Sequence, residues 1–311
     1  MQISVVIPTY NRLPILQKCL TALEKQELSD DKIEDYEIVV VDDGSSDRTL
    51  AWLAENQTNL PHVKAIEQNH QGAAAARNLG VNNAVGDTII FIDSDLVVTS
   101  SFLQSHANAL AKGKQDLGSD RLFTYGAVIN TNNFEDPTSE PYKLTDFSAA
   151  YFATGNVAIA RKWLEQAGLF DTGFQLYGWE DLELGVRLKK LNLKLIKCPQ
   201  AVGYHWHPAF NLEQIPQAIE REIERGKMGV VFYDKHPTLD VRMMIQMTVL
   251  HRLLWGILSL GGILNERTLQ PVLKWLIARD RPQLAEQIAR IFLNWYNVQG
   301  VYSAYNQREV N

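Results

Sequence analysis

Short apolar runs alternate with helical patterns through the first hundred residues of this chain. The runs are rich in valine and isoleucine, as in strands that are buried on both faces of a parallel sheet. We expect strands at residues 3–8, 36–41, 63–67 and 88–92, and helices at residues 13–25, 47–55, 72–84 and 101–111. Alternation of strand and helix is the pattern of βαβ units, so the sequence predicts an α/β fold with a mainly parallel sheet.

The pattern changes along the rest of the chain. Residues 113–150 are loosely patterned, with glycines and prolines on either side of an expected strand at 122–130. A short helix is expected at 161–168, a longer one at 179–191, and extended segments at 194–198 and 201–207. After Pro208 we expect helices, at residues 215–228, 240–263 and 269–295. The sequence therefore predicts two domains, an α/β domain at residues 1–210 and a helical C-terminal extension at residues 211–311.

Composition narrows the class of protein. Of the 311 residues, 46% are apolar and 21% are charged, as in soluble globular proteins. The net charge is −6 and Lys and Arg form no block, so we expect no nucleic-acid partner. Cys19 and Cys198 alone make neither a zinc site nor a disulfide framework. The presence of only two cysteines fits a reducing compartment. The first residues are typical of a strand rather than a signal peptide. We therefore expect a cytoplasmic protein.

The longest apolar stretch, residues 243–264, is predicted to be too short to cross a membrane. His251 and Arg252 lie near its middle, and only the 13 residues from 253 to 265 are free of charge, whereas a spanning helix needs about 20. One interpretation is a buried helix that packs on the α/β domain or on a second copy of the chain in a homodimer. The other is a helix in a membrane interface, which would make the protein peripheral at the inner face of the membrane. We expect burial.

Polar residues follow three of the expected strands directly. The first strand leads into Thr9-Tyr10-Asn11-Arg12, the second into Asp42-Asp43-Gly44-Ser45 and the fourth into Asp93-Ser94-Asp95. These are ordinary turn residues, but the carboxyl ends of parallel strands meet at one edge, where ligands bind. Carboxylates gathered there need a cation or a donor-rich ligand. No Walker sequence occurs and no GxGxxG follows the first strand. A divalent ion held by Asp93 and Asp95 is therefore the expected way to bind a diphosphate.

Two later segments also carry candidate site residues. Glu180, Asp181 and Glu183 open the expected helix at 179–191. Acids there complement the helix dipole, and the same dipole favours an ionised Asp181 that accepts a proton from a hydroxyl. In the segment His205-Trp206-His207 an extended backbone turns both imidazoles to one side. Neutral imidazole is a metal ligand, and ordinary structural histidines are the alternative.

Taken together, these segments resemble the family-2 inverting glycosyltransferases of the GT-A fold. The similar segments are SVVIPTYNR, VVVDDGSSDRT, GAAAARNLG, FIDSDLVV, TGNVAIARK and GFQLYGWEDLELGVRL. They follow the family's order over about residues 3–207. The resemblance implies a Rossmann-like, nucleotide-diphospho-sugar transferase fold whose mixed sheet is flanked by helices. It also implies transfer of a sugar from a nucleotide-diphosphate sugar, with UDP as the expected nucleotide, in polysaccharide or glycoconjugate synthesis.

The resemblance also implies which residues bind the nucleotide. Pro8, Thr9 and Tyr10 match the part of the family that lines the nucleotide pocket, and Ser94 belongs to the same group of contacts. Asp42 or Asp43 is implied to hydrogen-bond the uracil or the ribose. Arg77, in the segment GAAAARNLG, is implied to face the base or the diphosphate.

The metal and catalytic residues are carried over in the same way. Asp95 is implied to bind Mn²⁺ or Mg²⁺, while Asp93 holds the ribose or shares the metal. Asp181 takes the place of the catalytic base and Glu180 that of an acceptor contact. His205 lies 24 residues after Asp181, an offset at which related enzymes place a metal-binding histidine. We therefore prefer it to His207 as the third ligand.

The expected partners are a nucleotide-sugar donor and a glycan or lipid-linked acceptor. A module that binds nucleotide sugars without transferring them is the alternative function. The complete set of Asp93, Asp95, Asp181 and His205 favours the enzyme, because we expect an inactive copy to lose at least one of them.

Overall fold

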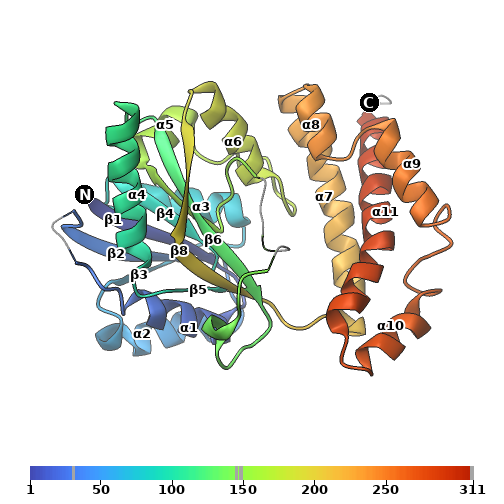
Figure 1. The fold of residues 1–311 in the computed structure, drawn as a ribbon, viewed down its shortest axis with the longest axis horizontal. Coiled ribbons are helices and arrows are strands. Elements are labelled where there is room, and N and C mark those ends of the chain that lie inside the picture. The colour runs from blue at the N-terminus through green and yellow to red at the C-terminus, as the bar shows by residue number, and fades with distance from the viewer. Residues whose placement is uncertain (30–31, 144–145, 147–149, 309–311) are drawn as a thin grey trace. The chain divides into compact units, whose positions relative to one another are not determined.

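The computed structural model describes residues 1–29, 32–143, 146 and 150–308, and the chain divides into two compact units (Figure 1). The first unit comprises Met1–Gln175 and Glu180–His207. The second comprises Leu176–Trp179 and Pro208–Asn311. The short segment Leu176–Trp179 thus belongs to the second unit, although the first unit surrounds it in the sequence.

A mixed sheet forms the centre of the first unit. Its strands are β1 (Gln2–Thr9), β2 (Asp35–Asp42), β3 (Val63–Glu67), β4 (Thr88–Ile92), β5 (Leu96–Val98), β6 (Leu122–Thr131), β7 (Asn156–Ala160) and β8 (Lys194–Trp206). Within the described residues their order is β3-β2-β1-β4-β7-β6-β8-β5. Strands β1 to β4 are parallel, whereas β7 is antiparallel to β4 and β6, and β5 is antiparallel to β8. The predicted α/β class with a mixed sheet is confirmed.

Helices cover both faces of this sheet, as Figure 1 shows. They are α1 (Leu13–Leu23), α2 (Thr49–Glu55), α3 (Ala73–Asn83), α4 (Phe102–Leu117), α5 (Arg161–Ala167) and α6 (Glu180–Lys190). Successive strand residues point to opposite faces, so Val5 belongs to one core, which includes Leu16 and Phe102, and Val6 to the other, which includes Leu184. This two-sided burial explains why the central strands β1 and β4 are almost continuously apolar.

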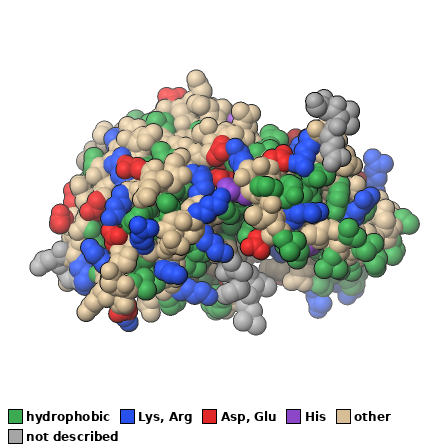
Figure 2. All heavy atoms as spheres, turned by 90° about the horizontal axis from the view of Figure 1, so that it is seen from above, with side chains coloured by type: hydrophobic (Ala, Val, Ile, Leu, Met, Phe, Trp, Pro, Cys, Tyr) green, Lys and Arg blue, Asp and Glu red, His purple; other side chains and the backbone are tan. Residues whose placement is uncertain are grey.

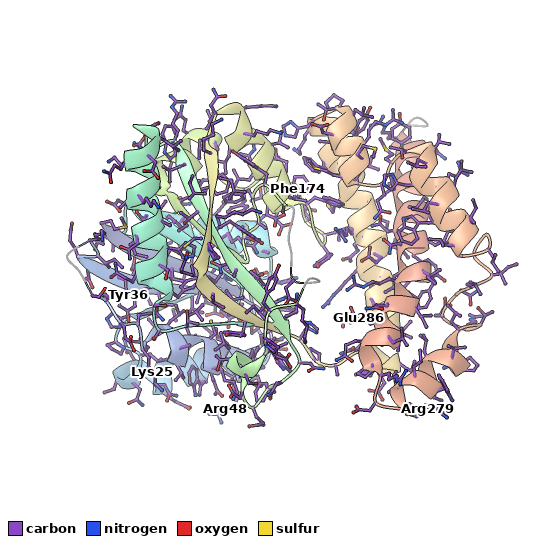
Figure 3. All side chains as sticks on the ribbon, viewed as in Figure 1. Lys25, Tyr36, Arg48, Phe174, Arg279 and Glu286 are labelled. Carbon is purple, nitrogen blue, oxygen red and sulfur yellow. The ribbon has the colours of Figure 1, made fainter. Side chains whose placement is uncertain are left out.

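Side-chain contacts also join the sheet to its helices. The Tyr36 hydroxyl, on a residue labelled in Figure 3, donates a hydrogen bond of 3.1 Å to the carbonyl oxygen of Leu23. This bond ties β2 to the end of α1. The Tyr36 ring stacks on His62 with the centroids 4.1 Å apart.

The main departures of the first unit from the sequence prediction concern one helix and three strands. Helix α4 continues to Leu117 because Gly113 packs against Leu122 and Ile196 instead of breaking the helix, and Gly118 ends it with φ 59°. Strands β5 and β7 were not predicted. The two segments expected near the end of the unit are one strand, β8.

Strand β8 is irregular opposite Gly126. The β6–β8 register shifts between Gly126 and Ala127, and a Cβ at residue 126 would lie 2.4 Å from the Ala201 oxygen and from Asn156 Nδ2. A side chain would therefore collide with the irregular part of β8.

The second unit is helical. Its helices are α7 (Ile215–Lys235), α8 (Leu239–Met244), α9 (Val249–Leu258), α10 (Gln270–Ile277) and α11 (Pro282–Arg308). A short 3₁₀ turn at Leu212–Gln214 precedes α7, and the first unit has similar turns at Gln57–Asn59 and Pro137–Ser139. Helices α7 and α11 cross closely, since a Cβ at Gly226 would lie 2.6 Å from the Asn297 oxygen. In the part of the chain that is described, no helix has the length and apolar character needed to cross a membrane.

Two long helices predicted for this unit are each broken. The one expected at 240–263 is interrupted by Gln246 with φ 59°, and Thr248 then caps α9 by accepting a hydrogen bond from the His251 N–H. The one expected at 269–295 is interrupted by Asp280 with φ 56°, after which α11 begins at Pro282. Proline is favoured at a helix start because its missing N–H costs nothing there. The expected burial is not seen within the chain at α9, which has no buried residue; burial against a second copy stays a prediction.

Candidate active site

The strand order brings the predicted polar loops together. Strand β1 lies between β2 and β4 and is parallel to both, so the loops that follow all three strands leave the same edge of the sheet. Asp42 is the last residue of β2, and Tyr10 and Asp93 are the first residues after β1 and β4. Thr9 is buried at the end of β1, and Ser94 is buried directly after Asp93, whereas Pro8 is half-buried.

Asp93, Asp95 and His205 form a compact group of metal-ligand type. Each offers one ligand atom, and these atoms lie within 4.8 Å of one another. His205 reaches the group because β8 pairs with β5 so that His205 lies opposite Leu96, directly after Asp95. His205 Nε2 is 3.1 Å from Asp95 Oδ1. Among the described residues the group does not include His207.

The charges in this group stabilise one another. Burial alone would raise the pKa of the Asp95 carboxyl, but the hydrogen bond with His205 and the charges of His205 and Arg12 hold that pKa below its usual value. Burial alone would lower the pKa of His205, but its bond to Asp95 and the charges of Asp95 and Asp93 raise it. The Arg12 guanidinium forms an ion pair with Asp95 Oδ2. A cation is thus already favoured beside Asp95.

Asn130 orients the His205 ring, a role that our sequence analysis missed. Asn130 Nδ2 donates a hydrogen bond of 2.9 Å to Asp146, a carboxylate that only accepts such bonds. The Asn130 Oδ1 atom therefore faces His205 Nδ1, at 3.4 Å. In neutral His205 this arrangement places the proton on Nδ1 and leaves the Nε2 lone pair toward Asp95. The pairing of β6 with β8 puts Asn130 opposite His205, a register that the sequence alone does not reveal.

The neighbouring acids Asp42 and Asp43 have different environments. Asp43 Oδ1 accepts hydrogen bonds from Gln68 Nε2 and the Gln71 N–H, and Oδ2 accepts one from the Gly72 N–H. Asp43 therefore holds the loop between β3 and α3. Asp42 Oδ1 accepts from the Ser45 N–H, but its buried Oδ2 has no hydrogen-bond partner among the described residues.

An aromatic surface lies beside these acids. The Tyr10 ring stacks on His70 with the centroids 4.4 Å apart and the planes at 29°. Tyr10 is 45% exposed, so its ring is accessible to a ligand. Thr9 Oγ1 is buried and, within the described part of the chain, makes no hydrogen bond. His70 was not a sequence candidate, because a single histidine in a loop gives no signal.

Arg77 connects the metal-type group to the acidic start of α6. Its Nη1 donates to Glu180 Oε1 at 2.9 Å, and its Nη2 donates to Asp93 Oδ1 at 3.2 Å. The residue is only 5% exposed. Arg77 lies between the two carboxylates, and its expected contact with the base or the diphosphate stays a prediction. Its contacts fix the position of Glu180 relative to Asp93.

The pKa of Asp181 lies well above that of an ordinary carboxyl, the opposite of the ionised state expected from the helix dipole. Burial and the adjacent Glu180 carboxylate raise the pKa of Asp181 to about 7, against the opposing effects of the Arg77 charge and of the Leu182 N–H that donates to it. A base with a pKa near the working pH both carries the right protonation state and accepts protons efficiently.

Comparisons with known proteins identify relatives. The family described as glycosyl transferase family 2 matches residues 4–168. A chondroitin synthase from Escherichia coli is 30% identical over 258 residues, a match that covers 71% of this chain and 37% of that protein. The chain thus spans well under half of that relative.

Solved structures show the same fold. A mannosyltransferase from Pyrobaculum calidifontis, PcManGT in complex with GDP-Man and Mn²⁺, has 19% identity and a TM-score of 0.55 over 96% of this chain and 86% of its own. S. aureus TarS 1–349 in complex with UDP has 17% identity and a TM-score of 0.51 over 100% and 92%. The predicted GT-A fold with a helical C-terminal region is confirmed.

Proposed function

Because the chain belongs to glycosyltransferase family 2, we propose that it transfers a sugar from a nucleotide-diphosphate sugar to an acceptor hydroxyl with inversion at the anomeric carbon. The observation that carries the proposal is the group of Asp93, Asp95 and His205, at the end of β4 and beside the polar loops of β1 and β2. A nucleoside diphosphate needs positive charge at such an acidic edge, and a divalent ion supplies it.

The donor set fits Mn²⁺ or Mg²⁺. Carboxylates suit both ions, and an imidazole nitrogen favours the transition metal Mn²⁺. Asp93, Asp95 and the Nε2 atom of His205 would hold the ion, and Asn130 orients the imidazole through Nδ1. When bound, the ion supplies Lewis-acid stabilisation of negative charge on the leaving diphosphate. PcManGT, solved with GDP-Man and Mn²⁺, supports this proposal.

The nucleotide is proposed to lie on the β1 and β2 side of the group. Asp42 is preferred to Asp43 as the nucleotide contact, since its Oδ2 is free while both Asp43 oxygens hold the loop. Tyr10 offers a ring on which a base can stack. UDP is the nucleotide we expect, and the likeness to TarS in complex with UDP supports it.

Asp181 is proposed to be the base. In an inverting transfer the acceptor oxygen attacks the anomeric carbon opposite the leaving group, and one base removes the hydroxyl proton. Asp181, with a pKa of about 7, can take that proton, and Glu180, fixed by Arg77, is placed to orient the acceptor. The likeness to a chondroitin synthase supports a glycan acceptor. A lipid-linked glycan is the other acceptor that we propose.

A panel of UDP- and GDP-sugars tests this function. Release of nucleoside diphosphate is measured with Mn²⁺, with and without glycan acceptors, and donor binding is measured by thermal protection. We expect one donor to be consumed faster with an acceptor present. Asp181→Asn should still be protected by that donor but release little nucleotide. A protein that is protected by a donor yet never releases nucleotide would be the binding module instead.

A further inference from the structure

Helix α9 leaves its apolar side largely exposed. Residues three and four apart share a face of a helix, and here the pattern gives a wholly aliphatic face. It consists of Val249, Leu250, Leu253, Leu254, Ile257 and Leu258, which are between 42% and 71% exposed. We call these six residues the α9 face. Leu260 and Ile263, in the loop that follows, are 57% and 65% exposed.

The opposite side of α9 packs inside the second unit. The Arg252 guanidinium lies over the Tyr302 ring of α11, 5.0 Å from its centroid. A Cβ at Gly256 would lie 3.5 Å from the Trp295 ring, and Trp255 donates a hydrogen bond to Gln246. The polar and aromatic residues of α9 thus contact the second unit. Val249, Leu253 and Ile257 border a hollow of about 450 Å³ beside Trp295 and Tyr302, and all six residues of the α9 face stay largely exposed. This is the reverse of a surface helix in water, and an exposed aliphatic patch of this kind marks an interaction site.

The sequence around α9 is positively charged. Residues 239–281 hold six Lys or Arg and three Asp or Glu, a net charge of +3 in a chain whose net charge is −6. Arg267 has a side chain that is 91% exposed. Arg279, labelled in Figure 3, lies over the Trp275 ring at 4.4 Å, and Trp275 is itself 53% exposed. Figure 2 shows hydrophobic side chains with Lys and Arg among them on the second unit.

We propose that the α9 face docks the protein on an anionic lipid bilayer surface. Aliphatic side chains that enter the boundary of headgroups and acyl chains, with basic residues beside them, are the features of a helix that lies in a membrane interface. Each basic residue near an anionic surface strengthens binding about fivefold. The contact is with one leaflet, since no helix among the described residues is suited to span a membrane.

Charge favours the bilayer over a second copy of the chain. A symmetric dimer through the α9 face would bring the same positively charged segment of both copies together, and like charges across an interface oppose association. Anionic headgroups instead attract that segment. The proposal is independent of the proposed transferase reaction, because none of its residues belongs to the candidate active site.

Vesicle co-sedimentation of the full chain tests the proposal. Vesicles of phosphatidylcholine alone are compared with vesicles that also contain phosphatidylglycerol. The double variant Leu253→Gln/Ile257→Gln removes two side chains of the α9 face and keeps good helix-forming residues. The matched control is Val85→Gln/Leu117→Gln, which changes two exposed apolar residues of the first unit, 60% and 44% exposed. Arg267→Gln/Lys274→Gln tests the charge, and sedimentation velocity gives the oligomeric state.

We expect binding to the anionic vesicles that weakens with salt and with the charge variant. Removal of the two aliphatic side chains should weaken it by roughly tenfold or more, while the control binds like the wild type. The proposal is overturned if the wild type does not bind anionic vesicles, or if the α9 variant and the control bind equally. If the wild type is a dimer that does not bind vesicles, and the α9 variant alone is monomeric, the α9 face is assigned to contact with a second copy of the chain. Thermal unfolding of each variant establishes that it is folded.

Discussion

Lowering the pH should slow sugar transfer steeply, because Asp181 must lose its proton before it can accept one. Its pKa is raised to about 7 by burial and by Glu180. At about pH 5, two units lower, roughly one molecule in a hundred holds the ionised base. At about pH 8 roughly nine in ten hold it. The value of kcat/KM should therefore fall about a hundredfold from pH 8 to pH 5, with a slope of about tenfold per unit below the pKa.

The same shift makes a prediction about stability. The pKa of Asp181 in the folded protein, about 7, lies above the ordinary value of 3.8, so the folded state holds the proton more tightly. Stability from this group is present at low pH and is lost as the pH rises from about 4 to about 7. A difference of about 3 units corresponds to at most about 4 kcal/mol. Asp181→Asn should therefore unfold at a higher temperature than the wild type at about pH 8, while its transfer rate falls about 10²–10⁴-fold.

The assay is kcat/KM for the donor at saturating Mn²⁺ across this pH range, since kcat/KM reports the groups of the free enzyme. UDP binding is followed at each pH to separate chemistry from donor affinity. Asp116→Asn is the matched control, because Asp116 is an exposed acid on α4. A flat profile between about pH 5 and pH 8, together with near-normal transfer by Asp181→Asn, would refute the assignment of Asp181 as base.

Four further substitutions have defined outcomes. Asn130→Ala should weaken Mn²⁺ binding about 10–100-fold in calorimetry, because it frees the His205 ring; unchanged affinity would dismiss its orienting role. Asp43→Ala should lower the free energy of unfolding by about 2–4 kcal/mol in urea, whereas Asp42→Asn should mainly weaken UDP binding; equal effects would contradict the division of roles. Gly126→Ala should destabilise the fold by about 1–3 kcal/mol, since its Cβ would lie 2.4 Å from a backbone oxygen; normal stability would show that β8 yields.

Secondary structure was most predictable where buried positions recur regularly along the sequence. The four strands expected in the first hundred residues lie within one residue of β1 to β4. Most residues of β1, β2 and β4 are buried, which requires apolar side chains throughout, whereas the edge strand β3 has no buried residue. The loops at their ends were predictable for the same reason, since parallel strands that alternate with helices place them at one edge. Strand β5 was missed because three residues are too few to show a pattern.

Contacts between strands of the sheet were harder to predict from the sequence. A sequence offset favoured His205 over His207, but the register of β8 against β5 and β6 places His205 beside Asp95 and Asn130. Asn130 gave no signal, since nothing local distinguishes it from any polar strand residue. The helix break at Gln246 in the second unit could not be predicted either, because no glycine or proline marks the positive φ of this glutamine.

Calorimetric titration of UDP tests the central claim, that a metal group of Asp93, Asp95 and His205 holds the diphosphate of the donor. The titration is made with Mn²⁺ and in excess chelator, for the wild type, Asp95→Asn and the control Asp116→Asn. We predict tight binding only with Mn²⁺, at least about tenfold weaker binding for Asp95→Asn, and no change for the control. UDP that binds equally well in chelator, with an affinity that Asp95→Asn does not alter, would contradict the account.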